Sequence, residues 1–412
     1  MASLITLPKA RADRLGLIRT LFTRHSGPDL SDNWLGGRAE ALQRLSKIQP
    51  ASYSKNRNFL NGDVTLLSPY IRHGCISISE AIEATKKIAK TDTDKLLFEF
   101  AWRDYWRKVW YFHGYDIESD MEPAKVALKR NAISEELKQA QTGLRCIDHF
   151  VSTLNSSGYL HNHARMWLAS YMIHWCGFDW RASADWMRYL LLDGDEASNN
   201  LSWQWVASTF GSKPYFFNKE NLRKYSDDQF CNQCHAHCPF DDSYEALNEK
   251  LFKPTTEPIK VYKKSLLPTL NCLPGLESIV LFHDEMLSSK HSLYQSSNRK
   301  IFIYDPSIQE NWAINRLQFI ADCLNEMPEV EVWVGNTAEV LNKIGVNKVM
   351  TQNTPNLKLK TLIAPYGAEY VQEQEPYSQS VAKKLGPKEI KRFSKYWNIV
   401  GPEILAPLCI ND

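Results

Sequence analysis

The sequence predicts a multi-domain protein in which an all-α domain precedes a C-terminal α/β domain with a parallel sheet. Two observations predict this order. Up to about residue 250, apolar residues recur at helical intervals, whereas after residue 275 short apolar runs alternate with amphipathic stretches. Such alternation requires a parallel sheet covered by helices. We expect a helical domain at 1–250, a linker rich in proline and lysine at 251–275, and the α/β domain at 276–412.

Length and composition allow two domains with substantial cores but identify no partner. The chain has 412 residues, 12% aromatic residues and a formal net charge of +2, which neither indicates nor excludes nucleic acid. The segment MASLITLPKARADRLGLIRT lacks the continuous apolar core of a secretory signal, and no run of about 18 apolar residues occurs. We therefore expect a soluble, cytoplasmic monomer with no membrane partner. Its nine cysteines suggest thiols or metal ligands before disulfides.

The first third of the chain contains three helical patterns. RAEALQRLSKI has apolar residues at helical intervals. In GDVTLLSPYIRHGCISISEAIEATKKI, a turn and a Ser-Pro break precede a helix that Ser77 or Ser79 caps. Hydroxyls and amides ahead of a helix can bind an anion, and a plain capped helix start is the alternative. In KLLFEFAWRDYWRKVWYF, Glu99, Trp102 and Arg103 share a face, although a surface Glu/Arg pair beside core tryptophans gives the same pattern.

The stretch from Gly158 to Tyr215 contains the strongest indication of a ligand. It carries six tryptophans among helix-forming residues, and polar residues recur inside its apolar helices. Unpaired polar groups lose free energy on leaving water, so a large planar, polar ligand held in a helical bundle is the economical explanation. An aromatic core with paired polar residues is the alternative. The preceding segment, 116–143, is polar and helix-forming.

A cysteine motif follows this stretch. Cys231, Cys234 and Cys238 give the spacing C-x2-C-x3-C-P, in which two thiolates on one tight turn can reach a single metal centre. With His235 and His237 between the thiols, the motif alone supports zinc nearly as well as iron-sulfur.

The last third alternates strands and helices. SIVLFHD, KIFIYDP, VEVWVGN, NKVMTQN and AEYVQEQ predict short buried strands, and NRLQFIADCLNEM, TAEVLNKIG and NLKLKTLIAPYG predict helices between them. No GxGxxG or P-loop signature is present, so nothing indicates nucleotide binding of the usual Rossmann kind.

The motifs LHNHARM, FDWR, LLLDGDEASNN and WQWVAST resemble the flavin-binding helical domain of the photolyase/cryptochrome family, in the same order. The resemblance is close over residues 50–245 and implies FAD as cofactor. It implies that Asn199 faces N5 of the flavin, where an amide can bond either protonation state, and that Arg165 pairs with Asp193. Val64 replaces one threonine of the family's phosphate loop. The implied FAD contacts are Tyr53, Thr65, Leu66, Leu67, Ser68, Arg103, Arg165, Asp193, Asp195 and Asn199.

The resemblance also implies a pocket for ultraviolet-damaged DNA. Its residues, Glu99, Trp102, Asn162, Met166 and Trp205, resemble those of cyclobutane pyrimidine dimer photolyases, whereas (6-4) photolyases carry histidines at the positions of Asn162 and Met166. We expect a deoxyribodipyrimidine photo-lyase, a carbon-carbon lyase that uses blue or near-ultraviolet light. A cryptochrome-like blue-light photoreceptor, a (6-4) photolyase and a light-independent electron-transfer protein are the alternatives.

Flavin reduction is implied to use a tryptophan chain. Trp203 and Trp180 match its two inner members, whereas Leu128 aligns with the outer one. Trp175, Trp186 or Tyr189 are candidates for another path.

Two further features follow from the resemblance. Cys146 lies where the iron-sulfur branch of bacterial cryptochromes and photolyases has its first cluster cysteine, so Cys146, Cys231, Cys234 and Cys238 are expected to hold a [4Fe-4S] cluster, with zinc or no metal as alternatives. The family carries its α/β domain, which can hold an antenna chromophore, at the N-terminus. We therefore expect a Rossmann-like, antenna-type domain in permuted order, with its pigment, if any, unknown.

Overall fold

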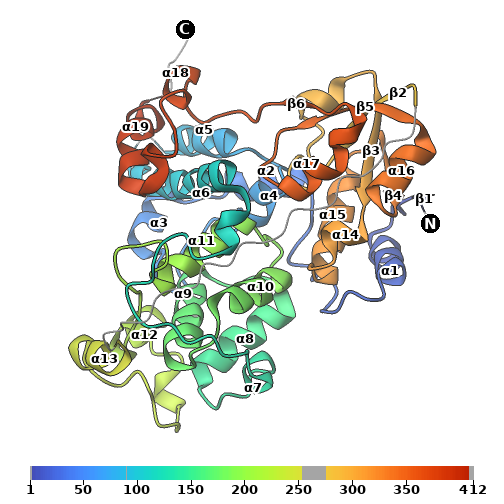
Figure 1. Ribbon diagram of the computed structural model, residues 1–412. Helices are drawn as coiled ribbons and strands as arrows, with labels where there is room; N and C mark the ends of the chain where they lie inside the picture. The colour runs from blue at the N-terminus through green and yellow to red at the C-terminus, as the bar shows by residue number, and fades with distance from the viewer. Residues whose placement is uncertain (1, 90, 253–274, 408–412) are drawn as a thin grey trace. The chain divides into compact units, whose positions relative to one another are not determined.

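The computed structural model describes residues 2–89, 91–252 and 275–407, and the chain divides into two compact units (Figure 1). The first unit comprises Met1–Pro50, Thr65–Gly114 and Ser265–Asp412, and the second comprises Ala51–Val64 and Tyr115–Lys264. This division assigns the N-terminal 50 residues to the unit that contains the sheet, whereas the sequence analysis places them in the helical domain. Most of the expected linker, 253–274, lies outside the described residues.

The first unit contains a six-stranded sheet in the order β1-β4-β3-β2-β5-β6. All pairings are parallel except that of β1 with β4, which is antiparallel. The five predicted strands are confirmed, while the N-terminal edge strand was not predicted. The strands are β1 (Ser3–Ile5), β2 (Glu277–Phe282), β3 (Arg299–Tyr304), β4 (Val330–Val334), β5 (Val346–Gln352) and β6 (Glu369–Val371).

The helices that accompany the sheet pack through a buried ion pair as well as through apolar contacts. α1 packs against α15, and Arg14 of α1 donates to Asp322 of α15 with an Nη2–Oδ1 distance of 2.8 Å. Both side chains are almost fully buried, so the pair must satisfy its own charges. The helices of this part are α1 (Arg11–Leu21), α14 (Pro306–Gln309), α15 (Ile314–Asn325), α16 (Thr337–Ile344) and α17 (Leu357–Ile363), with 3₁₀ turns at η4 (Ser292–Gln295) and η5 (Ala364–Tyr366).

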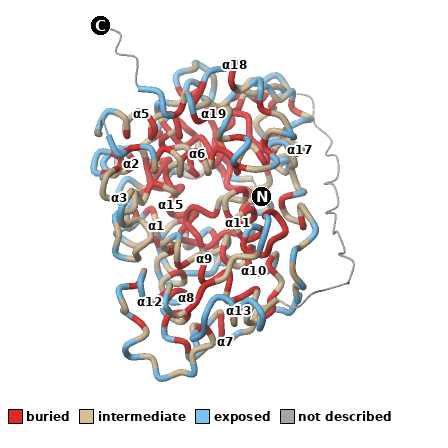
Figure 2. Tube along the Cα trace, turned by 90° about the vertical axis from the view of Figure 1, so that its left-hand side faces the viewer, coloured by how far each residue is buried: buried red, intermediate tan, exposed pale blue. Residues whose placement is uncertain are grey.

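A second group of helices in the first unit is organised around the long helix α6. Buried residues, red in Figure 2, run through α6 and the C-terminal helix α19, which pack together. Asp104 of α6 accepts hydrogen bonds from the phenols of Tyr377 (2.9 Å) and Tyr396 (2.5 Å), which fixes the C-terminal segment on α6. Ser77 caps α5 as expected, in a capping box with Glu80. These helices are α2 (Arg38–Ser46), α4 (Ser68–Arg72), α5 (Ile78–Ile88), α6 (Asp94–His113), α18 (Gln379–Ala382), η6 (Glu389–Lys391) and α19 (Phe393–Leu405).

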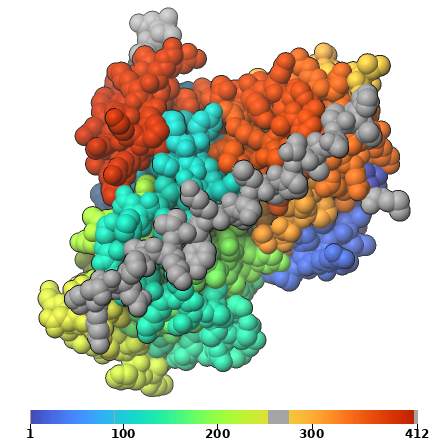
Figure 3. All heavy atoms as spheres, viewed as in Figure 1, coloured from blue at the N-terminus to red at the C-terminus, as the bar shows by residue number. Residues whose placement is uncertain are grey.

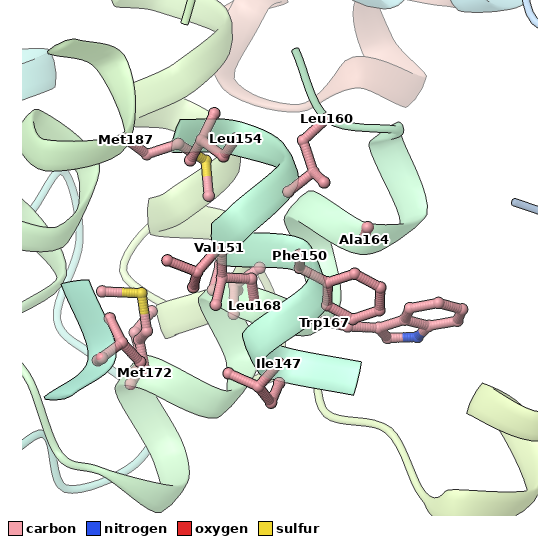
Figure 4. Close-up of a cluster of buried hydrophobic side chains, with 14 of the residues drawn as sticks. Ile147, Phe150, Val151, Leu154, Leu160, Ala164, Trp167, Leu168, Met172 and Met187 are labelled. Carbon is pink, nitrogen blue, oxygen red and sulfur yellow. The ribbon is translucent and has the colours of Figure 1, made fainter. Parts of the chain in front are cut away.

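The second unit is helical around one apolar cluster. In Figure 4, Phe150 of α8 lies beside Trp167 of α9, and their ring centroids are 5.9 Å apart. Residues 171–175 form a π-helix that continues α9, an irregularity that often occurs at functional sites. The elements are α3 (Pro50–Asn56), η1 (Gly114–Glu118), α7 (Glu135–Lys138), α8 (Arg145–Ser157), α9 (Asn162–Ser170), η2 (Tyr171–Trp175), α10 (Trp180–Leu190), α11 (Glu196–Ala207), α12 (Lys219–Tyr225), η3 (Cys231–Gln233) and α13 (Tyr244–Leu251).

The polar segment 116–143 departs from its predicted helical character. Apart from the end of η1 and the short helix α7, it is extended or turn-like, and Asn131 forms a parallel bridge with Phe178. Between residues 121 and 131, several of its backbone groups bond to other parts of the second unit, for example the N–H of Glu122 to the carbonyl of Thr209 and the N–H of Asn131 to the carbonyl of Gly177. No helix among the described residues combines the length and apolar character that a bilayer span requires.

Candidate functional site

The predicted site residues are divided between the two units, and each group is described within its own unit. The first unit contains Thr65, Leu66, Leu67, Ser68, Glu99, Trp102 and Arg103. The second contains Tyr53, Asn162, Arg165, Met166, Trp180, Asp193, Asp195, Asn199, Trp203, Trp205 and the four predicted cluster cysteines.

The predicted phosphate loop precedes α4 and is locally strained. Leu66 has a φ of 52°, a left-handed conformation that a leucine rarely adopts. The backbone N–H of Leu67 bonds to Thr65 Oγ1 at 3.4 Å, and Ser68 is the first residue of α4. The loop therefore presents a hydroxyl and helix-start amides in a tight turn, which suits an anion but is also found at ordinary helix starts.

On α6, Glu99 and Trp102 already have intramolecular partners. Lys95 Nζ lies 2.8 Å from Glu99 Oε1, and both side chains are about one-third exposed. The ring of Trp102 stacks on Phe393 of α19, with centroids 3.7 Å apart and an interplanar angle of 6°. The indole also contacts the rings of Trp106 and Tyr105, at centroid distances of 5.1 and 5.7 Å, so Trp102 is part of an aromatic cluster within its own unit.

In the second unit, Arg165 and Asp193 form the expected pair. Arg165 Nη1 and Nη2 donate to Asp193 Oδ1 and Oδ2 at 3.2 and 3.0 Å, and Arg165 Nε donates to the carbonyl of Leu160 at 2.8 Å. Asp193 is buried, and this two-point contact fixes the orientation of its carboxylate between α9 and α11.

Asp195 and Asn199 define the start of α11. Asp195 is the N-cap and accepts from the N–H of Ser198 at 2.6 Å. Asn199 Nδ2 donates to the carbonyl of Ala184 (2.9 Å) and to Asn200 Oδ1 (3.1 Å), so both amide hydrogens are used. Because a carbonyl can only accept, the Ala184 contact fixes the amide orientation, and Asn199 Oδ1 is the atom that remains to accept a donor from a ligand.

The predicted lesion residues of this unit lie at its surface. Asn162 is exposed at the first turn of α9, and its Nδ2 lies 3.6 Å from Met166 Sδ on the next turn. Trp205 is 36% exposed and packs against Tyr215, with ring centroids 5.2 Å apart. An exposed indole held by a second ring is a suitable surface for stacking a base.

The predicted electron-transfer residues Trp203 and Trp180 are buried in the same apolar cluster. Leu128, which the resemblance aligns with the outer tryptophan, packs against that cluster. Trp180 Nε1 donates to Asp120 Oδ1 at 2.7 Å. Sequence reasoning missed Asp120, because a single aspartate in a polar segment carries no motif and its contact is 60 residues away along the chain.

Two histidines of the LHNHARM motif are also held close together. His161 caps α9 by accepting from the N–H of His163 at 3.1 Å, and the ring of His163 packs on Trp167 and Tyr225. Burial, with help from neighbouring positive charge, lowers the pKa of each histidine to about 4. Both rings are therefore neutral at physiological pH.

The four predicted cluster cysteines lie within electrostatic reach of one another. Burial is the main cause that raises the pKa of Cys146 to about 12, and the neighbouring thiols of Cys231, Cys238 and Cys234 act in the same direction. The N–H of Cys234 bonds to the carbonyl of Cys231 in a tight turn, on a yellow-green segment at the surface in Figure 3. Within the described residues, no three or more His, Cys, Asp or Glu side chains converge on a position for a metal ion.

Comparisons with known proteins find similarity over part of the chain. Residues 96–245 match the family described as the FAD binding domain of DNA photolyase. The chain is similar to a deoxyribodipyrimidine photo-lyase of Halobacterium salinarum (31% identity over 177 residues, 40% of this chain and 37% of that protein). It is also similar to a cryptochrome DASH of Xenopus laevis (32% over 204 residues, 46% and 39%). The chain thus spans less than half the length of these relatives.

Solved structures give partial similarities. A bacterial class III photolyase from Agrobacterium tumefaciens is 26% identical with a TM-score of 0.43, over 55% of this chain and 53% of that chain. A cryptochrome of Synechocystis sp. is 23% identical with a TM-score of 0.44, over 48% and 46% of the two chains.

Proposed function

We propose that this chain, which belongs to the photolyase/cryptochrome family through its FAD-binding domain, repairs cyclobutane pyrimidine dimers in DNA by light-driven electron transfer. The observation that carries the proposal is the match to that domain over residues 96–245, because this segment contains all five predicted lesion residues, which lie on α6, α9 and α11. Photo-lyases at 30–31% identity support the same activity.

Several residues would hold FAD in the second unit. The Arg165–Asp193 pair and Asp195 present fixed polar groups, and the acceptor oxygen of Asn199 suits a protonated N5. Tyr53 of the same unit would be a further contact. In the first unit, the turn of Thr65, Leu66, Leu67 and Ser68 is the proposed phosphate-binding loop, and Arg103 on α6 is the other FAD contact that the resemblance implies. Reduced FAD, when bound, supplies an electron to the dimer under blue or near-ultraviolet light.

The remaining predicted residues would bind the lesion. Enzymes that act on a base within a duplex, photolyases among them, extrude it from the stack. In the second unit, the exposed ring of Trp205 would stack against the extruded dimer, while Asn162 and Met166 would line its edge. In the first unit, Trp102 is the aromatic residue proposed to contact the lesion. Glu99 would exchange its Lys95 partner for the polar edge of the dimer and stabilise charge that develops there.

The Glu99→Ala variant tests this assignment. We expect repair of dimer-containing oligothymidine to slow by about tenfold to a hundredfold while bound FAD is unchanged. The readout is the return of thymine absorbance under illumination, and Glu83→Ala, an exposed glutamate on α5, is the matched control. Full repair by Glu99→Ala would remove the assigned role.

A blue-light photoreceptor without repair activity is the second candidate. The cryptochrome DASH relatives at 31–32% identity favour it. Light-driven flavin reduction in the wild-type protein without any return of thymine absorbance would replace repair by signalling. Repair of (6-4) photoproducts and not of cyclobutane dimers would change the lesion that we assign as the substrate.

We also propose that Cys146, Cys231, Cys234 and Cys238 hold a [4Fe-4S] cluster. The electrostatic proximity of the four thiols supports this donor set, which is typical of such clusters. Protein purified without oxygen should contain about four iron and four sulfide per chain, and Cys234→Ser should lose them while Cys176→Ser retains them. A content of one zinc per chain, or of no metal, would contradict the proposed [4Fe-4S] cluster.

The α/β part of the first unit is proposed to correspond to the family's N-terminal antenna-type domain in permuted order. The five strands from β2 through β6 all lie after residue 276 and pair only in parallel with one another, which supports this correspondence. The test is the excitation spectrum of flavin fluorescence. A bound antenna pigment would add to it a band that the absorption spectrum of FAD lacks.

A further inference from the structure

The buried hydrogen bond between Trp180 and Asp120 gives the proposed electron-transfer chain a proton acceptor. We propose that Asp120 takes the indole proton when Trp180 is oxidised, so that the charge produced by light is held at Trp180. The inference rests on the proposed light-driven function and concerns how Trp180 supplies an electron without an outer tryptophan.

The hydrogen bond is short and shielded from water. Trp180 Nε1 lies 2.7 Å from Asp120 Oδ1, and the two residues are 2% and 8% exposed. The second carboxylate oxygen of Asp120 accepts from Arg130 Nη2 at 2.5 Å, and the side chain of Arg130 is 28% exposed. Asp120 therefore places one oxygen on the indole and the other toward a cation at the boundary with solvent.

The segment that carries Asp120 is fixed to the helix of Trp203. Gln204, fully buried and next to Trp203 in α11, accepts from the N–H of Met121 at 2.9 Å and donates to the carbonyl of Ile117 at 2.9 Å. These two bonds lie on either side of Asp120. The side chain of Gln204 thus sets the position of the Asp120 carboxylate relative to Trp203.

A second set of bonds fixes the same segment to the start of α10. The N–H of Asn131 donates to the carbonyl of Gly177 at 3.1 Å, and the N–H of Asp179 donates to the carbonyl of Asn131 at 2.9 Å. Arg130 Nη1 also lies 3.8 Å from Asp179 Oδ1, and Asp179 pairs with Arg181. Arg130 therefore has a second carboxylate at hand if Asp120 becomes neutral.

The proposed step balances in electrons and protons. One electron leaves the indole of Trp180 for oxidised Trp203, whose own electron has gone to the oxidant, a photo-excited flavin. The Nε1–H bond of Trp180 breaks and an Oδ1–H bond forms on Asp120. The products are a neutral indolyl radical and a carboxylic acid, with Trp203 restored.

Leu128 explains why such a step is needed. By the resemblance, Leu128 stands where the family has its outer tryptophan, and its side chain, which packs against the cluster of Trp180 and Trp203, does not carry an oxidising charge outward along that route. An oxidised indole is a much stronger acid than a neutral one, and a carboxylate at hydrogen-bond distance is a ready acceptor. Losing the proton removes the positive charge and slows the return of the electron.

The test compares Asp120→Asn with Asp185→Asn in the full chain with FAD bound. The asparagine keeps an acceptor oxygen for the indole but has no charge and cannot take the proton. Asp185 is an exposed aspartate on the same helix as Trp180, paired with Arg188, so its variant removes the same charge. After a laser flash, we expect the tryptophan radical of Asp120→Asn to decay about tenfold faster and to keep the spectrum of the cation, whereas Asp185→Asn behaves as wild type.

Two measurements on the wild-type protein do not depend on the variant folding. Deuterated water should slow formation of the neutral radical by about twofold, because a proton moves in that step. In the dark, the indole N–H resonance that disappears in Trp180→Phe should lie downfield of ordinary indoles, as expected for a carboxylate acceptor. A wild-type radical that stays cationic and is insensitive to deuterium would overturn the inference while leaving light-driven reduction intact. Absence of any light-driven flavin reduction would also overturn it, whereas the proposed function fails separately, if illumination of protein that carries reduced FAD restores no thymine absorbance.

Discussion

Each of the two units buries an aspartate that accepts hydrogen bonds from aromatic side chains, and the donors differ. Asp104 of the first unit, 5% exposed, accepts from the phenols of Tyr377 and Tyr396. Asp120 of the second unit, 8% exposed, accepts from the indole of Trp180 and from Arg130. The first arrangement joins two chain segments, whereas the second surrounds a side chain that is proposed to lose an electron.

The surroundings of the two carboxylates fit these different tasks. Near Asp104, burial would lower the pKa of Lys108, but the charges of Asp104 and Glu375 raise it above its usual value, so charge is balanced inside the unit. Asp120 has its cation at the solvent boundary, with an alternative partner beside it. A buried carboxylate that only stabilises the fold benefits from permanent neutralisation, and one that accepts a proton benefits from a partner that can leave.

The largest expected effect is a loss of folding stability when Asp104, and not Asp120, loses its role as an acceptor for two phenols. Asp104→Ala leaves two buried phenols without their acceptor, and each such loss costs about 1–3 kcal/mol, so we expect destabilisation by about 3–5 kcal/mol. Urea titration measures this loss of stability, and hydrogen exchange of the α19 amides shows whether α19 is affected. The control is Asp94→Ala at the exposed start of α6, which should cost less than about 1 kcal/mol. A loss below that figure for Asp104→Ala would remove its structural role.

Acid should affect the second unit through its histidines. Burial lowers the pKa of His161, His163 and His174 to about 4, so they stay neutral when folded but bind protons when unfolded below about pH 6.5. Their contribution is complete above pH 6.5 and is lost as the pH falls toward 4. We expect about 2 kcal/mol for each histidine. Urea titrations at pH 7 and 4.5 should show a smaller difference in His163→Gln, and an unchanged difference would contradict the assignment.

The smallest effect concerns two helix caps. Ser77→Ala removes the capping box of α5 and Asp195→Ala removes the cap of α11, each at a cost of about 1 kcal/mol. Because Asp195 is also a proposed FAD contact, its variant alone should gain less thermal stability when FAD is added. Melting temperatures with and without FAD distinguish the two. Equal stabilisation by FAD would exclude Asp195 from the flavin site.

Local patterns predicted most elements because their causes are local. The runs SIVLFHD and KIFIYDP became β2 and β3, and the Ser77 cap and the amphipathic helix α6 are where hydroxyl and apolar spacing indicated. The pairing of Arg165 with Asp193 is confirmed as well. The roles of the flavin, lesion and cysteine residues stay predictions.

What the sequence did not predict depends on distant contacts. Residues 3–5 form a strand only because β4 offers an edge, and three residues carry no periodicity. The segment 119–133 has helix-forming composition, yet the bonds from Gln204, Gly177 and Asp179 hold it extended. Asp120 was missed for the same reason, since only the fold brings it to Trp180.

The edge strand β1 has a consequence for biosynthesis. Ser3 pairs with Val334, so the hydrogen bonds of β1 cannot close until the chain has been synthesised through β4. At about 5–20 residues per second, translation of the intervening chain takes roughly 20–60 s. During that interval the second unit, whose segments end before residue 265, has time to fold ahead of the first.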